Sequence, residues 1–179
     1  MRSFVRSAVH VKGRAARLLG VLLLALAAAC AAPAAAPPAG APRGGVEAEA
    51  RAFMEAYGRD LLAGDRAAIA ARYDAAGAYF MGNGHKEFMP FEAIRARYAG
   101  PEWSAPRGFE WRDLSYEVAG PDAVVVTGLF AWGLCPGAPP LVMSYTGLLV
   151  RREGGLRIRL EDESVDPRTP PPAPCPGAR

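Results

Sequence analysis

The hydrophobic pattern of this chain changes its period once, near Pro106, and this change restricts the fold more than any other feature. Before Pro106, apolar residues recur every three or four positions, which is the spacing of one face of a helix. After Pro106, apolar and polar residues alternate over long runs, which is typical of strands with one buried face. Helices followed by strands predict an α+β domain in which the helices pack on one face of an antiparallel sheet.

Three helices are predicted before Pro106. The first has one apolar face, made of Val46, Ala50, Phe53, Tyr57 and Leu61, and Gly64 is expected to end it. Asp65 is placed to cap a second, shorter helix. Pro90 suits the first turn of a third helix, which Gly100-Pro101 should stop. Between the second and third helices, Ala78 to Met81 is predicted as a short strand, with a turn at Gly82-Asn83-Gly84.

Four long strands are predicted after Pro106, and clusters of glycine and proline separate them. They span Phe109–Val118, Ala123–Leu134, Leu141–Arg152 and Leu156–Val165. Successive strands joined by such short connections favour an antiparallel meander.

The N-terminus has the layout of a secretory signal. Basic residues up to Arg17 precede an apolar run over residues 18–29, and small residues lead into Cys30. The stretch Leu26-Ala27-Ala28-Ala29-Cys30 resembles a bacterial lipoprotein box, so we expect residues 1–30 to be removed as a signal and Cys30 to carry a membrane-anchoring lipid in the cell envelope. The alternative is cleavage near Ala34-Ala35-Ala36, which would remove Cys30 and leave a soluble periplasmic or secreted protein.

Composition divides the rest of the chain into three parts. Residues 31–45 are almost entirely Ala, Pro and Gly and predict an extended tether, residues 46–166 form the folded domain, and residues 167–179 are a Pro-rich tail. The formal net charge of +3 comes from the signal, because 16 basic residues face 18 acidic ones after Arg17. No net positive field remains to attract a phosphate backbone, so nucleic acid is excluded as a partner.

The order of these elements resembles the nuclear transport factor 2-like superfamily, in particular its small bacterial SnoaL-like members. The segments that carry the resemblance are Gly64–Ala68, Pro90–Gly100, Ala123–Gly128 and Gly154–Ser164, and it covers about residues 46–166. It implies a cone-like, curved antiparallel sheet wrapped around the N-terminal helices, with a pocket at the wide end. Members include isomerases, cyclases, dehydratases and proteins that only bind ligands or partners, so the fold leaves the function open.

Two side chains are candidates for acid–base chemistry in such a pocket. Leu156, Ile158 and Leu160 set an inward register in the last strand, and its continuation would bring Asp162 into the pocket, where burial raises a carboxyl pKa. The alternative is that Asp162 belongs to a solvated acidic strand end. His85 follows the predicted turn, and the resemblance places this loop near the pocket mouth, where an imidazole could exchange a proton. The alternative is a histidine with surface hydrogen bonds.

The expected pocket wall is aromatic and apolar. Its candidate residues are Tyr57, Tyr73, Tyr79, Phe80, Met81, Trp103, Trp111, Trp132 and Tyr145, with Asp162 among them, although part of this set is expected to pack in the core. The sequence shows no metal-ligand spacing and no phosphate-binding glycine motif, so we expect neither a metal nor a cofactor.

The cysteines suggest a disulfide. Export permits one, and in a meander the strand before Cys135 ends at the same edge as the last strand, with Cys175 nine residues past Asp166. We therefore predict a bond between Cys135 and Cys175; the alternative is two unpaired thiols.

Four functions remain open at this point. The first, which we favour, is an envelope protein that binds a small apolar molecule in the cone without catalysis. The second is an isomerase, cyclase or dehydratase that uses Asp162 or His85. The others are a module that binds a partner or forms a homodimer through its sheet, and a tethered structural protein.

Overall fold

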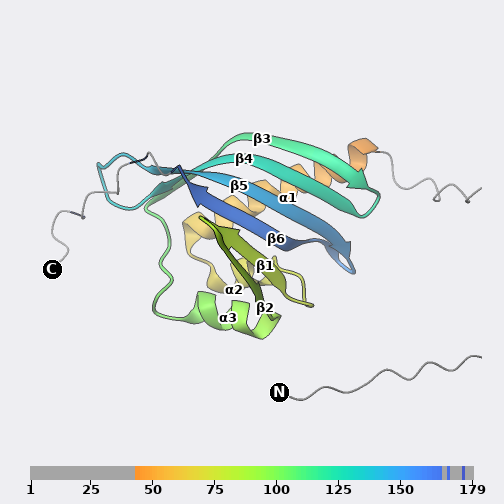
Figure 1. The fold of residues 1–179 in the computed structure, drawn as a ribbon, viewed down its shortest axis with the longest axis horizontal. Coiled ribbons are helices and arrows are strands. Elements are labelled where there is room, and N and C mark those ends of the chain that lie inside the picture. Colours follow the sequence, from red (N-terminus) through yellow and green to blue (C-terminus); the bar gives the residue numbers. More distant parts are fainter. Residues whose placement is uncertain (1–42, 167–168, 170–174, 176–179) are drawn as a thin grey trace, which may run out of the picture. The chain divides into compact units, whose positions relative to one another are not determined.

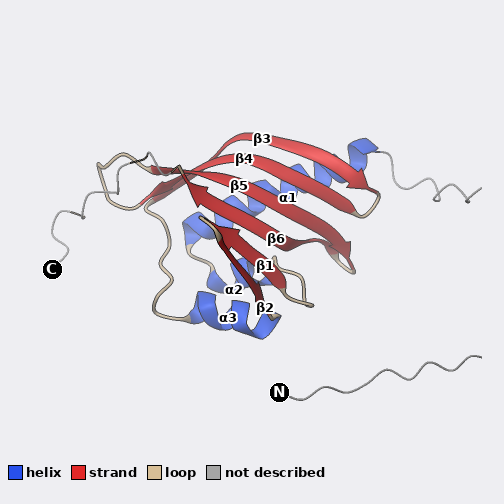
Figure 2. Ribbon diagram, in the orientation of Figure 1, coloured by secondary structure: helices blue, strands red, loops and turns tan. Residues whose placement is uncertain are grey.

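The computed structural model describes residues 43–166, Thr169 and Cys175. The predicted signal, its lipidation site Cys30 and most of the predicted tether and tail lie outside these residues. The described part is an α+β fold (Figures 1 and 2). Its helices are α1 (Arg43–Ala63), α2 (Arg66–Ala71) and α3 (Phe91–Ala99), and its strands are β1 (Ala78–Gly82), β2 (His85–Met89), β3 (Gly108–Gly120), β4 (Ala123–Gly133), β5 (Leu141–Arg152) and β6 (Gly155–Val165).

The strands form one six-stranded sheet with the order β2-β1-β6-β5-β4-β3 (Figure 2). Strands β3 to β6 make the predicted antiparallel meander, whereas β1 pairs with β6 in parallel. Strand β2 is not among the predicted elements, because the sequence pattern indicates a loop at His85. Asn83 and Gly84 both have positive φ angles, of 47° and 83°, and this geometry closes a tight hairpin that turns the segment back along β1.

The helices form where their start and stop signals predict them. The Asp65 carboxylate accepts a hydrogen bond from the Ala68 amide at 3.0 Å and so caps α2, and Pro90 stands directly before α3. Helix α1 begins at Arg43, slightly before the predicted domain boundary, and packs across the sheet (Figure 1). Its buried face uses Met54, while the predicted Phe53 is only half-buried.

A bulge in β6 changes which of its residues face α1. Leu149 lies opposite Ile158, but the preceding Leu148 lies opposite Leu160, so Arg159 is one extra residue in β6. One extra residue reverses the inward and outward positions beyond it. Glu161 therefore takes an inward position and is 3% exposed. The prediction that the inward register continues to Asp162 is wrong, since Asp162 lies opposite the exposed Thr146 on the outer face.

Cys135 and Cys175 form the disulfide that the sequence predicts, with their Cα atoms 5.5 Å apart. The bond attaches the C-terminal segment to the loop between β4 and β5. Within the described residues, no helix is long and apolar enough to cross a membrane.

Candidate functional site

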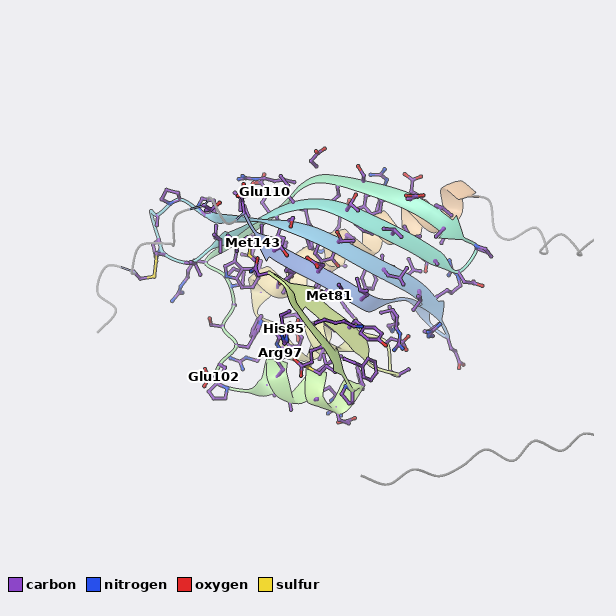
Figure 3. All side chains as sticks on the ribbon, in the orientation of Figure 1. Met81, His85, Arg97, Glu102, Glu110 and Met143 are labelled. Carbon is purple, nitrogen blue, oxygen red and sulfur yellow. A yellow bond between two sulfur atoms is a disulfide. The ribbon has the colours of Figure 1, made fainter. Side chains whose placement is uncertain are left out.

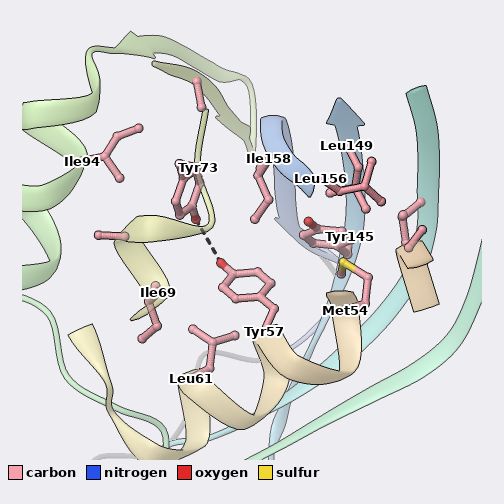
Figure 4. Close-up of a cluster of buried hydrophobic side chains, with 14 of the residues drawn as sticks. Met54, Tyr57, Leu61, Ile69, Tyr73, Ile94, Tyr145, Leu149, Leu156 and Ile158 are labelled. Atoms are coloured by element: carbon pink, nitrogen blue, oxygen red, sulfur yellow. Dashed lines mark hydrogen bonds between the residues drawn. The ribbon is translucent and has the colours of Figure 1, made fainter. Parts of the chain in front are cut away.

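A carboxyl group surrounded by tyrosines lies in the core. The Tyr73 hydroxyl donates to Oε1 of Glu161 at 2.6 Å, and the Tyr57 hydroxyl reaches Oε2 at 3.5 Å. The Tyr73 oxygen is also 2.7 Å from the Tyr98 hydroxyl and 3.0 Å from that of Tyr57, a contact drawn in Figure 4. Because Tyr73 donates to Glu161, the Tyr98 hydroxyl donates to Tyr73. These bonds replace the water that a buried carboxyl loses.

The four members of this tyrosine network come from four parts of the chain. Tyr57 lies on α1, Tyr98 on α3 and Glu161 on β6, while Tyr73 follows α2. Backbone bonds hold the Tyr73 segment against β6: the Asp74 amide donates to the Ile158 carbonyl at 3.0 Å, and the Ile158 amide donates back to Arg72 at 2.8 Å. The network therefore exists only when helices and sheet are assembled.

A cavity of about 330 Å³ lies next to this network. Its lining side chains come from β1, β2, α3, β5 and β6, and Figure 3 labels Met81, His85, Arg97 and Met143 among them. Phe80, Glu161 and Glu163 also line it, with Gly82, Asn83 and Glu87. Gly82 is required here, because a Cβ at this position would collide with the carbonyl oxygen of Glu163. The volume is at the lower end of the range of about 300–1,000 Å³ that is usual for ligand sites.

Two of the carboxyl groups that line the cavity, those of Glu161 and Glu163, titrate near neutral pH. Burial, and then the charge of Glu163, raise the pKa of Glu161 to about 8, although the Tyr73 hydrogen bond and the Arg97 charge oppose the shift. Burial also raises the pKa of Glu163 to about 7, against the opposing charge of Arg97. Burial raises the pKa of Tyr73 well above its usual value, so this tyrosine stays a neutral donor. The pair can therefore hold and exchange a proton at physiological pH.

The buried hydroxyl of Tyr145 has no hydrogen-bond partner among the described residues. Its ring lies over Gly147, where a Cβ would be 2.6 Å from the hydroxyl oxygen, and Gly147 lies opposite Glu161 in the sheet. A side chain at residue 147 would displace Tyr145 from the neighbourhood of the buried carboxyl.

The two predicted acid–base residues, Asp162 and His85, do not lie together in the cavity. The Asp162 carboxylate accepts a hydrogen bond from the Ser164 hydroxyl at 2.8 Å and lines an open hollow beside the β1–β2 hairpin. His85 begins β2 instead of lying on a loop. Its side chain is 72% exposed at the rim of the cavity, with Nε2 3.8 Å from Glu87. The inward positions belong to Glu161 and Glu163.

Of the residues predicted for the pocket wall, Phe80 and Met81 line this cavity. The others lie elsewhere, and packing in the core was expected for part of the set. Tyr57, Tyr73 and Tyr145 are buried, and Trp103, Trp111 and Trp132 pack against the core. Tyr79 packs against Phe88, with ring centroids 5.1 Å apart. The cavity residues that sequence reasoning missed are Arg97, Met143, Glu161 and Glu163. The alternation of β5 could have predicted that Met143 faces inward, because it lies two residues from the buried Tyr145. The bulge that turns Glu161 inward has no sequence signal.

The described residues contain no group of three or more His, Cys, Asp or Glu side chains placed to hold a metal ion. What they define is a helix-packed, curved sheet with a small acidic cavity among β1, β6 and α3.

This fold is that of the nuclear transport factor 2-like proteins. A protein of this type of unknown function from Shewanella oneidensis matches with a TM-score of 0.57 and 12% identity, over 65% of this chain and 97% of its own. A candidate ketosteroid isomerase from Parabacteroides distasonis matches with a TM-score of 0.55 and 16% identity, over 66% of this chain and 86% of its own. A candidate scytalone dehydratase from Novosphingobium aromaticivorans matches with a TM-score of 0.56 and 14% identity, over 76% of this chain and 97% of its own.

No protein-family model matches the sequence, and no curated protein matches it. At these identities the structural likeness establishes the fold, and function has to be argued from the cavity.

Proposed function

We propose that this domain binds a small organic molecule in the cavity between β1, β6 and α3. The observation that carries the proposal is the lining: the apolar side chains of Phe80, Met81 and Met143 share one small cavity with the carboxyl groups of Glu161 and Glu163. Ligand sites have this composition, in which apolar walls hold the body of a ligand and a few polar groups orient it.

Filling the cavity tests this proposal. Met143→Trp places a larger side chain at the cavity wall, and Thr146→Trp adds the same side chain at an exposed position of the same strand as a matched control. Native mass spectrometry of protein purified under mild conditions should find a bound small molecule on the wild type and on Thr146→Trp, and none on Met143→Trp. The same bound molecules on all three proteins, or none on any, would reject the cavity as the binding site.

A second candidate function is proton transfer on a bound carbonyl compound. It is favoured by the pKa of Glu163, which burial brings to about 7, and by the tyrosine network behind Glu161. A general base works best when its pKa is close to the working pH. The Glu163 carboxylate would take a proton from the carbon next to the carbonyl while protonated Glu161 donates to the carbonyl oxygen, giving an enol. Glu163 would then return the proton to the same carbon or, in a β,γ-unsaturated compound, to the γ-carbon with a shift of the double bond.

Deuterium exchange into cyclohexanone, followed by NMR in deuterated water, distinguishes this enzyme from a binding protein. Catalysed exchange should fall by about two to four decades in Glu163→Gln. Glu117→Gln makes the same change at an exposed position of β3 and should leave the exchange rate unchanged. Exchange no faster than in protein-free buffer would count against the enzyme and leave the binding function in place.

We further propose that the protein is exported and attached to a membrane through a lipid on Cys30. The basic and apolar layout of residues 1–30 supports export, and the Cys135–Cys175 disulfide suits an oxidising compartment. Cys30→Ala should move the protein from the membrane fraction to the soluble fraction. Unchanged fractionation, with no lipid on the N-terminal peptide, would contradict this.

A further inference from the structure

The inner wall of the cavity is formed by Glu161 and Glu163, which are hydrogen-bond acceptors when ionised, whereas the side chains of the lining that carry donors, Arg97, Asn83 and His85, are exposed. Among the described residues, no side chain donates to the Glu163 carboxylate and no cation forms an ion pair with it within 4 Å. The hydroxyl groups of Tyr57, Tyr73 and Tyr98 are already engaged with one another and with Glu161. A ligand that satisfies this wall has to supply donors of its own.

The negative charge of Glu161 and Glu163 is also not fully compensated by positive charge. Glu161 and Glu163 together face a single guanidinium, that of exposed Arg97. With both carboxyl groups ionised, this set carries a formal charge of −1, and one added positive charge would neutralise it. The Arg97 guanidinium lies 4.9 Å above the centre of the Phe80 ring, so an aromatic face of this cavity already accommodates a cation.

The apolar side chains of the cavity indicate what the uncharged part of the ligand is. Met81 and Met143 line the same cavity as Phe80, and methionine side chains adapt to irregular apolar shapes. A compact hydrocarbon group fits this surface, and the volume of about 330 Å³ limits its size.

We infer that the cavity takes a small organic amine, bound as its ammonium ion between Glu163 and Glu161, with an apolar body against Phe80, Met81 and Met143. This inference rests on the proposed binding function and names the chemical class of the ligand. The ammonium supplies the donors and the positive charge that Glu161 and Glu163 lack.

Proton release should accompany amine binding. Burial keeps both carboxyl groups partly protonated near neutral pH, and an ammonium beside them favours the ionised form. The affinity for an amine should therefore increase as the pH rises from 6 to 8. The charged and titratable groups around Glu163 are Glu161 and Asp162 on β6, Arg97 and Tyr98 on α3, Tyr57 on α1, Tyr145 on β5, and His85 and Glu87 at the rim.

Three probes of nearly equal size test the charge: benzylamine, benzyl alcohol and benzoate, titrated at pH 7.5 and followed by the NMR signals of the Met81 and Met143 methyl groups. Benzylamine should bind at least tenfold more tightly than benzyl alcohol. Glu163→Gln should remove this preference, so that benzylamine binds the variant no more tightly than benzyl alcohol does. Asp162→Asn, which removes the same charge on the outer face, should keep the preference.

Any other outcome contradicts the inference that the ligand is an amine. If benzyl alcohol or benzoate binds as tightly as benzylamine, the ligand is neutral or anionic, and the binding function stands. If the preference survives in Glu163→Gln, the positive charge is recognised elsewhere. If none of the three probes shifts the methyl signals, the amine is rejected, and the binding function is judged separately by the molecules retained on wild type and Met143→Trp.

Discussion

Glu161 should make the folded protein less stable as the pH rises. The buried carboxyl has a pKa of about 8 in the folded state against an ordinary value of 4.5, so the folded protein holds this proton more tightly than the unfolded chain. Its contribution to stability is complete below the ordinary pKa and is lost as the pH rises through the folded one. One proton corresponds to about 1.4 kcal/mol per pH unit, so the free energy of unfolding falls by about 3 kcal/mol between pH 5 and pH 8 through Glu161.

Glu161→Gln removes this titration and keeps an amide that can bond to the tyrosines. Relative to wild type, the variant should gain about 3 kcal/mol of stability between pH 5 and pH 8. Glu163 adds a slope of the same sign that both proteins keep, because burial raises its pKa as well. Urea unfolding followed by tryptophan fluorescence at half-unit pH steps measures the difference.

A control variant and a clear negative result complete this test. Glu117→Gln makes the same change at an exposed position of β3 and should follow the wild type at every pH. If the difference between Glu161→Gln and wild type stays constant within about 0.5 kcal/mol over the whole range, Glu161 is not a buried proton site and the network has been misread.

Three further predictions concern stability at pH 7 and can be measured by the same unfolding assay. Cys175→Ser opens a loop of 40 residues and should lower the free energy of unfolding by about 4 kcal/mol; an unchanged value would mean that the bond does not form. Tyr73→Phe removes a donor from buried Glu161 and should cost about 1–3 kcal/mol, while Tyr79→Phe, which alters a ring packed outside the network, should cost much less. Asp74→Asn should cost about 2 kcal/mol, because the buried carboxylate bonds to an arginine and an amide that hold its pKa below the usual value. This last difference should shrink in acid as the pH falls through the folded pKa, and a constant difference would contradict it.

Local patterns were sufficient to predict most helices and strands of this protein. The boundaries of β5, Leu141–Arg152, agree with the sequence interpretation, because alternation and the flanking turns are properties of neighbouring residues. The same holds for α2, whose cap is Asp65. The disulfide was predicted from the export signal together with topology, since a meander brings the ends of alternate strands to the same edge.

Tertiary structure alone decided the composition of the cavity. The parallel pairing of β1 with β6 and the extra residue Arg159 depend on contacts between segments far apart in the chain. Alternation has a period of two, so this single residue was enough to put Glu161 inside and Asp162 outside. A buried glutamate is tolerated where Tyr57, Tyr73 and Tyr98 converge on it from three separate segments. Sequence determines what each short segment prefers, whereas the burial of a carboxyl depends on which distant side chains replace its water.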